Sequence, residues 1–82
     1  MKIFDEFYPE ASNLQKRIIK STLKCHRSEW LEVDSLFIHY KVNQKKIDKE
    51  IDKMLSEDRP LIMIREDSRS IALTDWGRII TI

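Results

Sequence analysis

The chain has 82 residues, of which 41% are hydrophobic and 35% are charged, and its formal net charge is +1. This length suits one domain with a small core, and the composition excludes disordered and membrane-spanning chains in favour of a soluble globular protein. The net charge alone indicates no partner, but residues 12–29 hold five basic residues against one acidic residue, so positive charge is concentrated there.

Three features bear on where the protein resides. No apolar run approaches the roughly 20 residues that a membrane-spanning helix needs. Asp5 and Glu6 stand where a signal peptide would have an apolar stretch. Cys25 is the only cysteine, so it cannot form an internal disulfide, which fits a reducing compartment. We therefore expect a cytoplasmic protein.

Residues 1–11 are expected to form an N-terminal arm that precedes a domain over residues 12–82. The arm is rich in aromatic residues, with Phe4, Phe7 and Tyr8 followed by Pro9. It could be extended or a short helix. Packing against the domain's own surface is favoured over a role as a dimerisation arm.

A first long helix is predicted from Ser12 or Asn13, either of which is a good N-cap, to about Arg27. At about 100° per residue, its apolar and basic side chains fall on opposite sides. The apolar side holds Leu14, Ile18, Ile19, Thr22 and Cys25. The opposite, wholly basic side holds Lys16, Arg17, Lys20, Lys24 and Arg27.

Shorter elements follow. Residues 30–33 are predicted to be extended, Asp34 is expected to cap a brief helix over residues 34–40, and Lys41 and Val42 form the turn after it. Asn43 is a plausible N-cap for a second long helix, which ends before Pro60. Its apolar residues at helical spacing are Ile47, Ile51, Met54 and Leu55.

Residues 61–64 and 70–73 are predicted to be paired strands, with a polar loop over residues 65–69 between them. After Gly77, the only glycine, residues 78–82 are ambiguous between a last helical turn and an edge strand. Their β-branched residues favour a strand.

This order of helix, short strand, short helix, turn, longer helix and hairpin resembles the winged-helix (winged helix-turn-helix) DNA-binding domain family over residues 12–78. The resemblance implies an α+β fold of three helices with a two- or three-stranded antiparallel β-wing. The matching positions are Trp30-Leu31, Val42-Asn43, Ile47, Ile51, Met54 and the Leu73-Thr74-x-x-Gly77 ending. Glu50 departs from the small residue common in the family, and residues 57–60 replace its glycine-containing turn.

The resemblance also implies that the third helix enters a DNA major groove. The outward arc of this helix holds Lys45, Lys49 and Lys53, with Lys46 beside them. Asn43 and Gln44 are then expected to read base edges, while the lysines meet phosphates of double-stranded DNA. Arg65 and Arg69 would reach adjacent DNA from the wing.

Two alternatives to DNA contact stay open. The lysines could simply form a solvated helix face, which is common on soluble proteins. The same fold could instead serve as a protein-interaction module, with the basic side of the first helix facing an acidic protein partner.

Nothing in the sequence indicates catalysis, a metal or a cofactor. Cys25 and His26 are adjacent, so their side chains diverge on a helix, and Cys25 is expected in the core. His39 has no second ligand at metal spacing, and one glycine cannot build a phosphate-binding loop. Trp30 and Trp76 are expected to be core anchors rather than base-stacking platforms.

The expected function is therefore that of a small DNA-binding transcriptional regulator. A single module of this size would bind DNA weakly, so a homodimer that reads two half-sites is expected. Candidate dimer surfaces are the arm and the C-terminal end. Their apolar residues are Phe4, Phe7, Tyr8, Ile79, Ile80 and Ile82.

Overall fold

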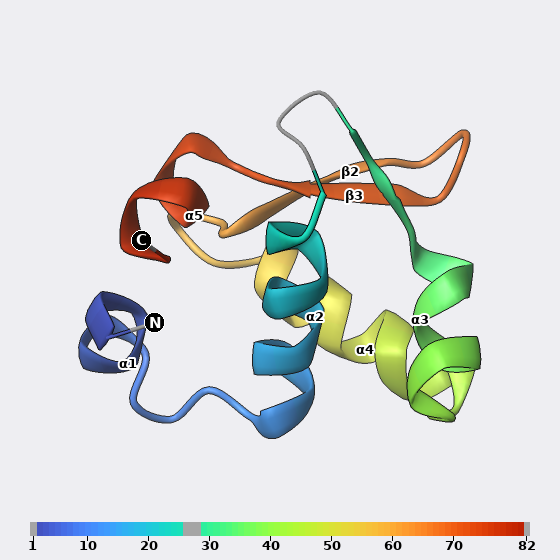
Figure 1. Cartoon of the computed structure of the whole chain (residues 1–82), viewed down its shortest axis with the longest axis horizontal. Coiled ribbons are helices and arrows are strands. Elements are labelled where there is room, and N and C mark those ends of the chain that lie inside the picture. Colours follow the sequence, from blue (N-terminus) through green and yellow to red (C-terminus); the bar gives the residue numbers. More distant parts are fainter. Residues whose placement is uncertain (1, 26–28, 82) are drawn as a thin grey trace.

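The fold is α+β, with helices beside a three-stranded antiparallel sheet (Figure 1). It is known from a computed structural model, which describes residues 2–25 and 29–81. The elements in chain order are α1 (Lys2–Phe7), α2 (Asn13–Leu23), β1 (Leu31–Glu32), α3 (Val33–Tyr40), α4 (Gln44–Leu55), β2 (Ile62–Arg65), β3 (Ser70–Leu73) and α5 (Asp75–Ile80).

The sheet has the strand order β1-β3-β2, so the last strand in the chain lies in the middle. β2 and β3 form the expected hairpin, in which Ile64 lies opposite Ile71 and Arg65 lies opposite Ser70. β1 adds two residues on the other side of β3. Every residue of β3 is buried, as expected for a central strand that is covered by helices.

The core lies between the sheet and the helices α2 and α4. α2 contacts both β3 and α4, while α4 also contacts β2. The inward side of α2 is the predicted one, with Ile18, Ile19 and Thr22 buried, and the Ser12 hydroxyl caps the helix by accepting a bond from the Gln15 amide at 3.1 Å. The apolar spacing of α4 is also confirmed, because Ile47, Ile51 and Met54 are buried.

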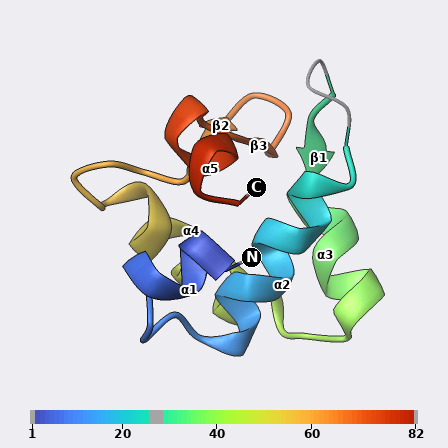
Figure 2. The ribbon, with the colours of Figure 1, turned by 60° about the vertical axis from the view of Figure 1, so that its left-hand side comes forward.

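Residues 2–7, which were expected to belong to an arm, form the short helix α1. Figure 2 shows α1 below the C-terminal helix α5, and the rings of Phe7 in α1 and Trp76 in α5 are in contact, with their centres 5.5 Å apart. Phe4 is fully buried in the same core as the rest of the chain. Tyr8 stacks on Phe4, and its hydroxyl accepts a hydrogen bond from the Trp76 indole at 3.0 Å. The segment thus packs against its own domain, and the extended alternative is wrong.

The structure corrects three element boundaries. α2 ends at Leu23, earlier than expected, and the expected end at Arg27 lies outside the described residues. α3 begins at Val33 with Glu32 in the cap position, so Asp34 is a first-turn residue and not the cap. Arg65 belongs to β2 rather than to the loop after it.

Of the two alternatives for residues 78–82, the favoured strand is wrong, because Asp75–Ile80 form the helix α5, in which residues 78–80 are the last turn. Thr74 starts this helix: its hydroxyl accepts a hydrogen bond from the Gly77 amide at 3.0 Å and donates one to the Pro60 carbonyl at 2.6 Å. Ile80 is then fully buried against the core. The cap and this burial outweigh the preference of β-branched residues for strands.

Candidate nucleic-acid interface

The start of α4 is set by Asn43, as predicted. Its side-chain oxygen accepts a hydrogen bond from the Lys45 amide at 2.8 Å, while Lys41, in the left-handed conformation with φ of 55°, turns the chain between α3 and α4. The Asn43 oxygen is therefore engaged within the chain. Its side-chain amino group and the exposed Gln44 side chain are the groups left for an external partner.

The lysines of α4 are exposed. Lys45, Lys46, Lys49 and Lys53 all lie on the side of the helix that faces away from Ile47 and Ile51. The ammonium of Lys53 lies 3.9 Å from a carboxylate oxygen of Glu50, which makes it a weak, exposed ion pair. No ion pair is recorded for Lys45, Lys46 or Lys49 with any described residue.

The carboxylates of α4 lie mostly beside this lysine row. Lys45, Lys49 and Lys53 share a shallow depression with Asp48 and Asp52. Glu50 lies on the other flank with only 14% of its side chain exposed, and its second oxygen is buried without a hydrogen-bond partner among the described residues. Glu50 therefore lies at the edge of the core, where a small residue had been expected.

Arg69 is engaged within the chain itself. Its guanidinium donates to Asp48 at 3.0 Å and to Asp34 at 3.2 Å, and so connects the hairpin to α4 and α3. The hydrogen bond to Asp48, and then the one to Asp34, raises the pKa of the Arg69 guanidinium. The main-chain oxygen of Arg69 also accepts from the Val33 amide at 2.8 Å.

Arg65 lies at the hairpin, as Arg69 does, but its side chain has a different partner. The Arg65 guanidinium stacks over the Trp30 ring with its central carbon 4.2 Å from the ring centre. Glu66 and Asp67 form the exposed bend between the two arginines. The tip of the hairpin is therefore acidic, and the exposed Arg65 lies at its base.

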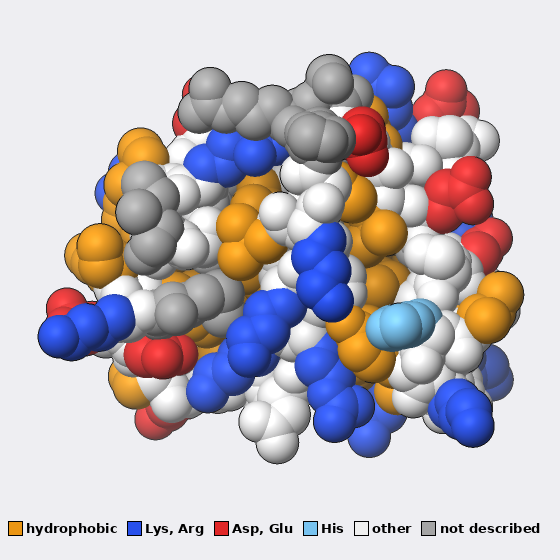
Figure 3. All heavy atoms as spheres, viewed as in Figure 1, with side chains coloured by type: hydrophobic (Ala, Val, Ile, Leu, Met, Phe, Trp, Pro, Cys, Tyr) orange, Lys and Arg blue, Asp and Glu red, His pale blue; other side chains and the backbone are white. Residues whose placement is uncertain are grey.

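The outward side of α2 forms a second basic surface. Arg17, Lys20 and Lys24 are exposed, whereas Lys16 is half-buried. Figure 3 shows basic side chains gathered over α2 on this face, with acidic ones toward its edges. Tyr40 of α3 borders this surface, because its hydroxyl donates to the Arg17 carbonyl and its ring lies under the Arg17 guanidinium.

Sequence reasoning missed the two carboxylate partners of Arg69. These ion pairs join residues 35 and 21 positions apart, and no local pattern indicates such a pairing. The position of Glu50 at the edge of the core agrees with its spacing, since it follows Ile47 by three residues on the same side of the helix.

Comparisons of the chain with protein-family models, with curated proteins and with solved structures find no match. The described residues include no cluster of histidine, cysteine and carboxylate side chains that could hold a metal ion. Among the same residues, no helix is both long and apolar enough to cross a membrane. The interface is therefore interpreted from its own geometry.

Proposed function

We propose that this chain is a small winged-helix DNA-binding protein, acting in transcriptional regulation, whose helix α4 docks in the major groove of double-stranded DNA. The arrangement of elements supports this reading. α2, β1, α3, α4 and the β2-β3 hairpin follow in the order expected of such a domain, and β3 lies between β1 and β2. α1 and α5 are additions to that arrangement.

The single observation that carries the proposal is the exposed amino-terminal half of α4. Gln44, Lys45, Lys46 and Lys49 are exposed there, while Ile47 and Ile51 hold the opposite side of the helix in the core. Lysine charges near the N-terminus of a helix repel one another and the partial positive charge at that end of the helix. A bound phosphate would relieve this repulsion. The lysines would meet phosphates, and Gln44 with the amino group of Asn43 would contact base edges.

The hairpin has a smaller part in this proposal. Arg65 would contact the DNA backbone beside the groove. Arg69 would act indirectly, because its two ion pairs with Asp34 and Asp48 fix the hairpin against the first turn of α3 and the middle of α4. The acidic bend at Glu66 and Asp67 would repel phosphate, so the tip itself would stay clear of the DNA.

A homodimer is part of the same proposal, because one module of this size offers a small contact area. Phe4 and Ile80, two of the expected dimer residues, are fully buried and cannot contribute. Phe7 and Ile79 are exposed, as is Ile3 of α1. These three side chains, on the helices at the two ends of the chain, are the proposed dimer surface.

The test is the salt dependence of duplex binding, measured by fluorescence anisotropy with a labelled duplex of mixed sequence. Replacing Lys45 and Lys49 together by alanine should reduce the slope of log affinity against log salt by roughly one unit for each lost phosphate contact. The control replaces Lys20 and Lys24 of α2, which removes the same charge from another helix and should change the slope less. Circular dichroism would check that both variants fold.

Equal slopes for the wild type and the Lys45/Lys49 variant would refute α4 as the DNA-reading helix.

A second candidate function is the binding of an acidic protein partner by α2. It is favoured by the exposed residues Arg17, Lys20 and Lys24, on a helix that has no acidic residue. Polyglutamate binding that is lost in the Lys20/Lys24 variant, without any duplex binding by the wild type, would support this second function.

A further inference from the structure

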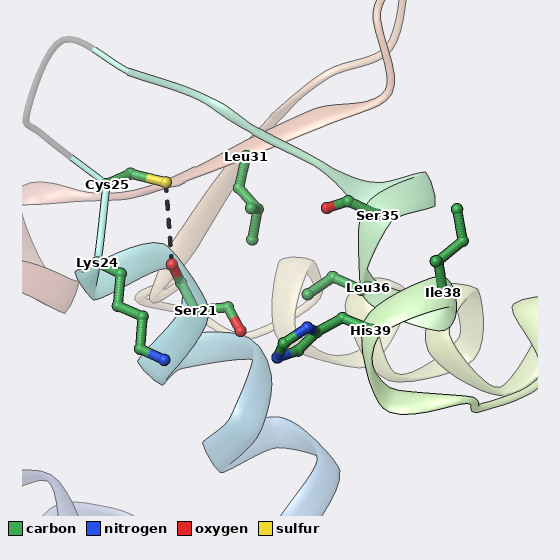
Figure 4. A pocket seen from close by; sticks show the side chains of 8 residues that line it. All are labelled: Ser21, Lys24, Cys25, Leu31, Ser35, Leu36, Ile38 and His39. Atoms are coloured by element: carbon green, nitrogen blue, oxygen red, sulfur yellow. Dashed lines mark hydrogen bonds between the residues drawn. The ribbon is translucent and has the colours of Figure 1, made fainter.

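A pocket of about 470 Å³ lies between the end of α2, β1 and α3, away from the lysine row of α4. Its volume is within the range of small-molecule sites, roughly 300 to 1,000 Å³. Figure 4 shows the side chains that line it. They are Ser21, Lys24, Cys25, Leu31, Ser35, Leu36, Ile38 and His39.

The pocket has an apolar part and a polar part. Leu31 and Leu36 form its floor, and Ile38, which is 75% exposed, forms a wall on the α3 side. Because Ile38 is so exposed and lies beside two other apolar side chains, the pocket presents apolar surface to water. Burying that surface is the main free energy that the pocket offers to a ligand.

The polar part holds hydrogen-bond donors, and none of the described residues that line the pocket is a carboxylate. Figure 4 shows the Lys24 ammonium and the His39 ring at the same side of the pocket. The Ser21 hydroxyl lies there too, but it donates its hydrogen bond to the Tyr40 hydroxyl. Lysine always donates, and an imidazole donates from at least one nitrogen in either protonation state. This side of the pocket therefore suits an anionic group, and the neighbouring exposed side chain of Lys20 adds positive charge.

We propose that the pocket binds a small anionic amphiphile, a carboxylate on an apolar tail. The carboxylate would accept hydrogen bonds from Lys24 and His39, and the tail would cover Leu31, Leu36 and Ile38. The separation of donors from apolar surface within one pocket matches the two ends of such a molecule. This proposal does not depend on DNA binding, because none of the α4 lysines lines the pocket.

The first experiment titrates decanoate, below its micelle concentration, into the ¹⁵N-labelled protein and follows the amide resonances. Saturable shifts are expected at the ends of α2, β1 and α3. Octanoate should bind about tenfold more weakly, because it buries two fewer methylene groups. Decylammonium, with the same tail and the opposite charge, should also bind more weakly than decanoate.

The second experiment compares two lysine variants on one helix. Lys24→Ala removes a pocket donor and should weaken decanoate binding about two- to fivefold, the range of a partly exposed ion pair. Lys20→Ala removes the same charge from the same side of α2 without touching the lining and should have a smaller effect. Both side chains are exposed, so neither variant should disturb the fold.

Cys25 gives an independent check, because it is the only cysteine and it lines the pocket. Its thiol donates a weak hydrogen bond to the Ser21 carbonyl at 3.8 Å. A bulky maleimide on Cys25 should fill the space and abolish decanoate binding, and bound decanoate should slow that reaction.

Four results would overturn the proposal. They are equal affinity for decanoate and decylammonium, equal affinity for decanoate and octanoate, equal loss in the Lys20 and Lys24 variants, and shifts confined to the exposed apolar residues of α1 and α5. Binding that requires anionic vesicles or an acidic peptide, with none to free decanoate, would overturn it as well.

Discussion

Replacing Gly77 by alanine should destabilise the protein, although alanine is the better helix former. Gly77 is the third residue of α5 and lies against the chain just before β2. A Cβ atom there would lie 2.3 Å from the Leu61 carbonyl oxygen, and 3.2 Å from both the Leu61 carbonyl carbon and a methyl carbon of Leu73. The nearest of these atoms belongs to the backbone, so the clash cannot be relieved by rotating a side chain.

The expected change in the free energy of unfolding is the sum of one stabilising and two destabilising contributions. Alanine gains about 1 kcal/mol over glycine in helix propensity. Overpacking a tight contact costs about 1 to 3 kcal/mol, occasionally more. The Leu61 carbonyl also accepts a hydrogen bond from the Thr74 amide at 3.0 Å, and displacing it would cost about a further 1 kcal/mol. The net loss expected for Gly77→Ala is about 1 to 3 kcal/mol.

The assay is urea unfolding followed by far-ultraviolet circular dichroism, because Trp76 is too close to the substitution to serve as a neutral probe. Lys49→Ala is the control: it lies on the exposed side of α4, and should change the free energy of unfolding by less than about 0.5 kcal/mol. A Gly77→Ala variant as stable as the wild type, or more stable, would refute the proposed close approach of α5 to Leu61.

Two further predictions concern packing and charge. Phe4→Ala should lower the free energy of unfolding by about 3 to 5 kcal/mol, which is comparable with the whole stability of so small a domain, so circular dichroism should show much of the chain unfolded. The control variant Phe7→Ala, at an exposed position, should stay folded. A folded Phe4→Ala variant would contradict the burial of α1. A double-mutant cycle of Arg69→Gln and Asp48→Asn should give a coupling of about 0.2 to 1 kcal/mol, because both side chains are more than one-third exposed. The pKa of Arg69 is raised in the folded state, so on the alkaline side the coupling is fully present below the unfolded-state pKa of Arg69 and is lost as the guanidinium deprotonates. The coupling should therefore be constant across neutral pH. A coupling of zero would contradict the ion pair between Arg69 and Asp48.

Local patterns in the sequence were sufficient for the elements that carry their own signals. Asn43 caps α4, and the inward row of Ile47, Ile51 and Met54 was read correctly from its spacing. The bounds of β3 were also predicted correctly. In each case the deciding forces act between residues a few positions apart, so the sequence itself contains the information.

The predictions that failed depended on contacts between distant residues. A strand was favoured over a last helical turn for residues 78–82, because their β-branched residues were weighed without the Thr74 cap and the buried site that receives Ile80. Arg69 was grouped with Arg65, whereas carboxylates of α3 and α4 hold it. The pocket beside Ile38 is formed by three separate elements, so no single stretch of sequence could have indicated it.

The surroundings of Trp76 couple the two ends of the chain. The edge of its ring contacts Phe7, its nitrogen donates to Tyr8, and the Arg59 guanidinium stacks 3.7 Å from the ring centre. α1 and α5 should therefore detach and reattach as one cooperative unit, with hydrogen-exchange rates that change together.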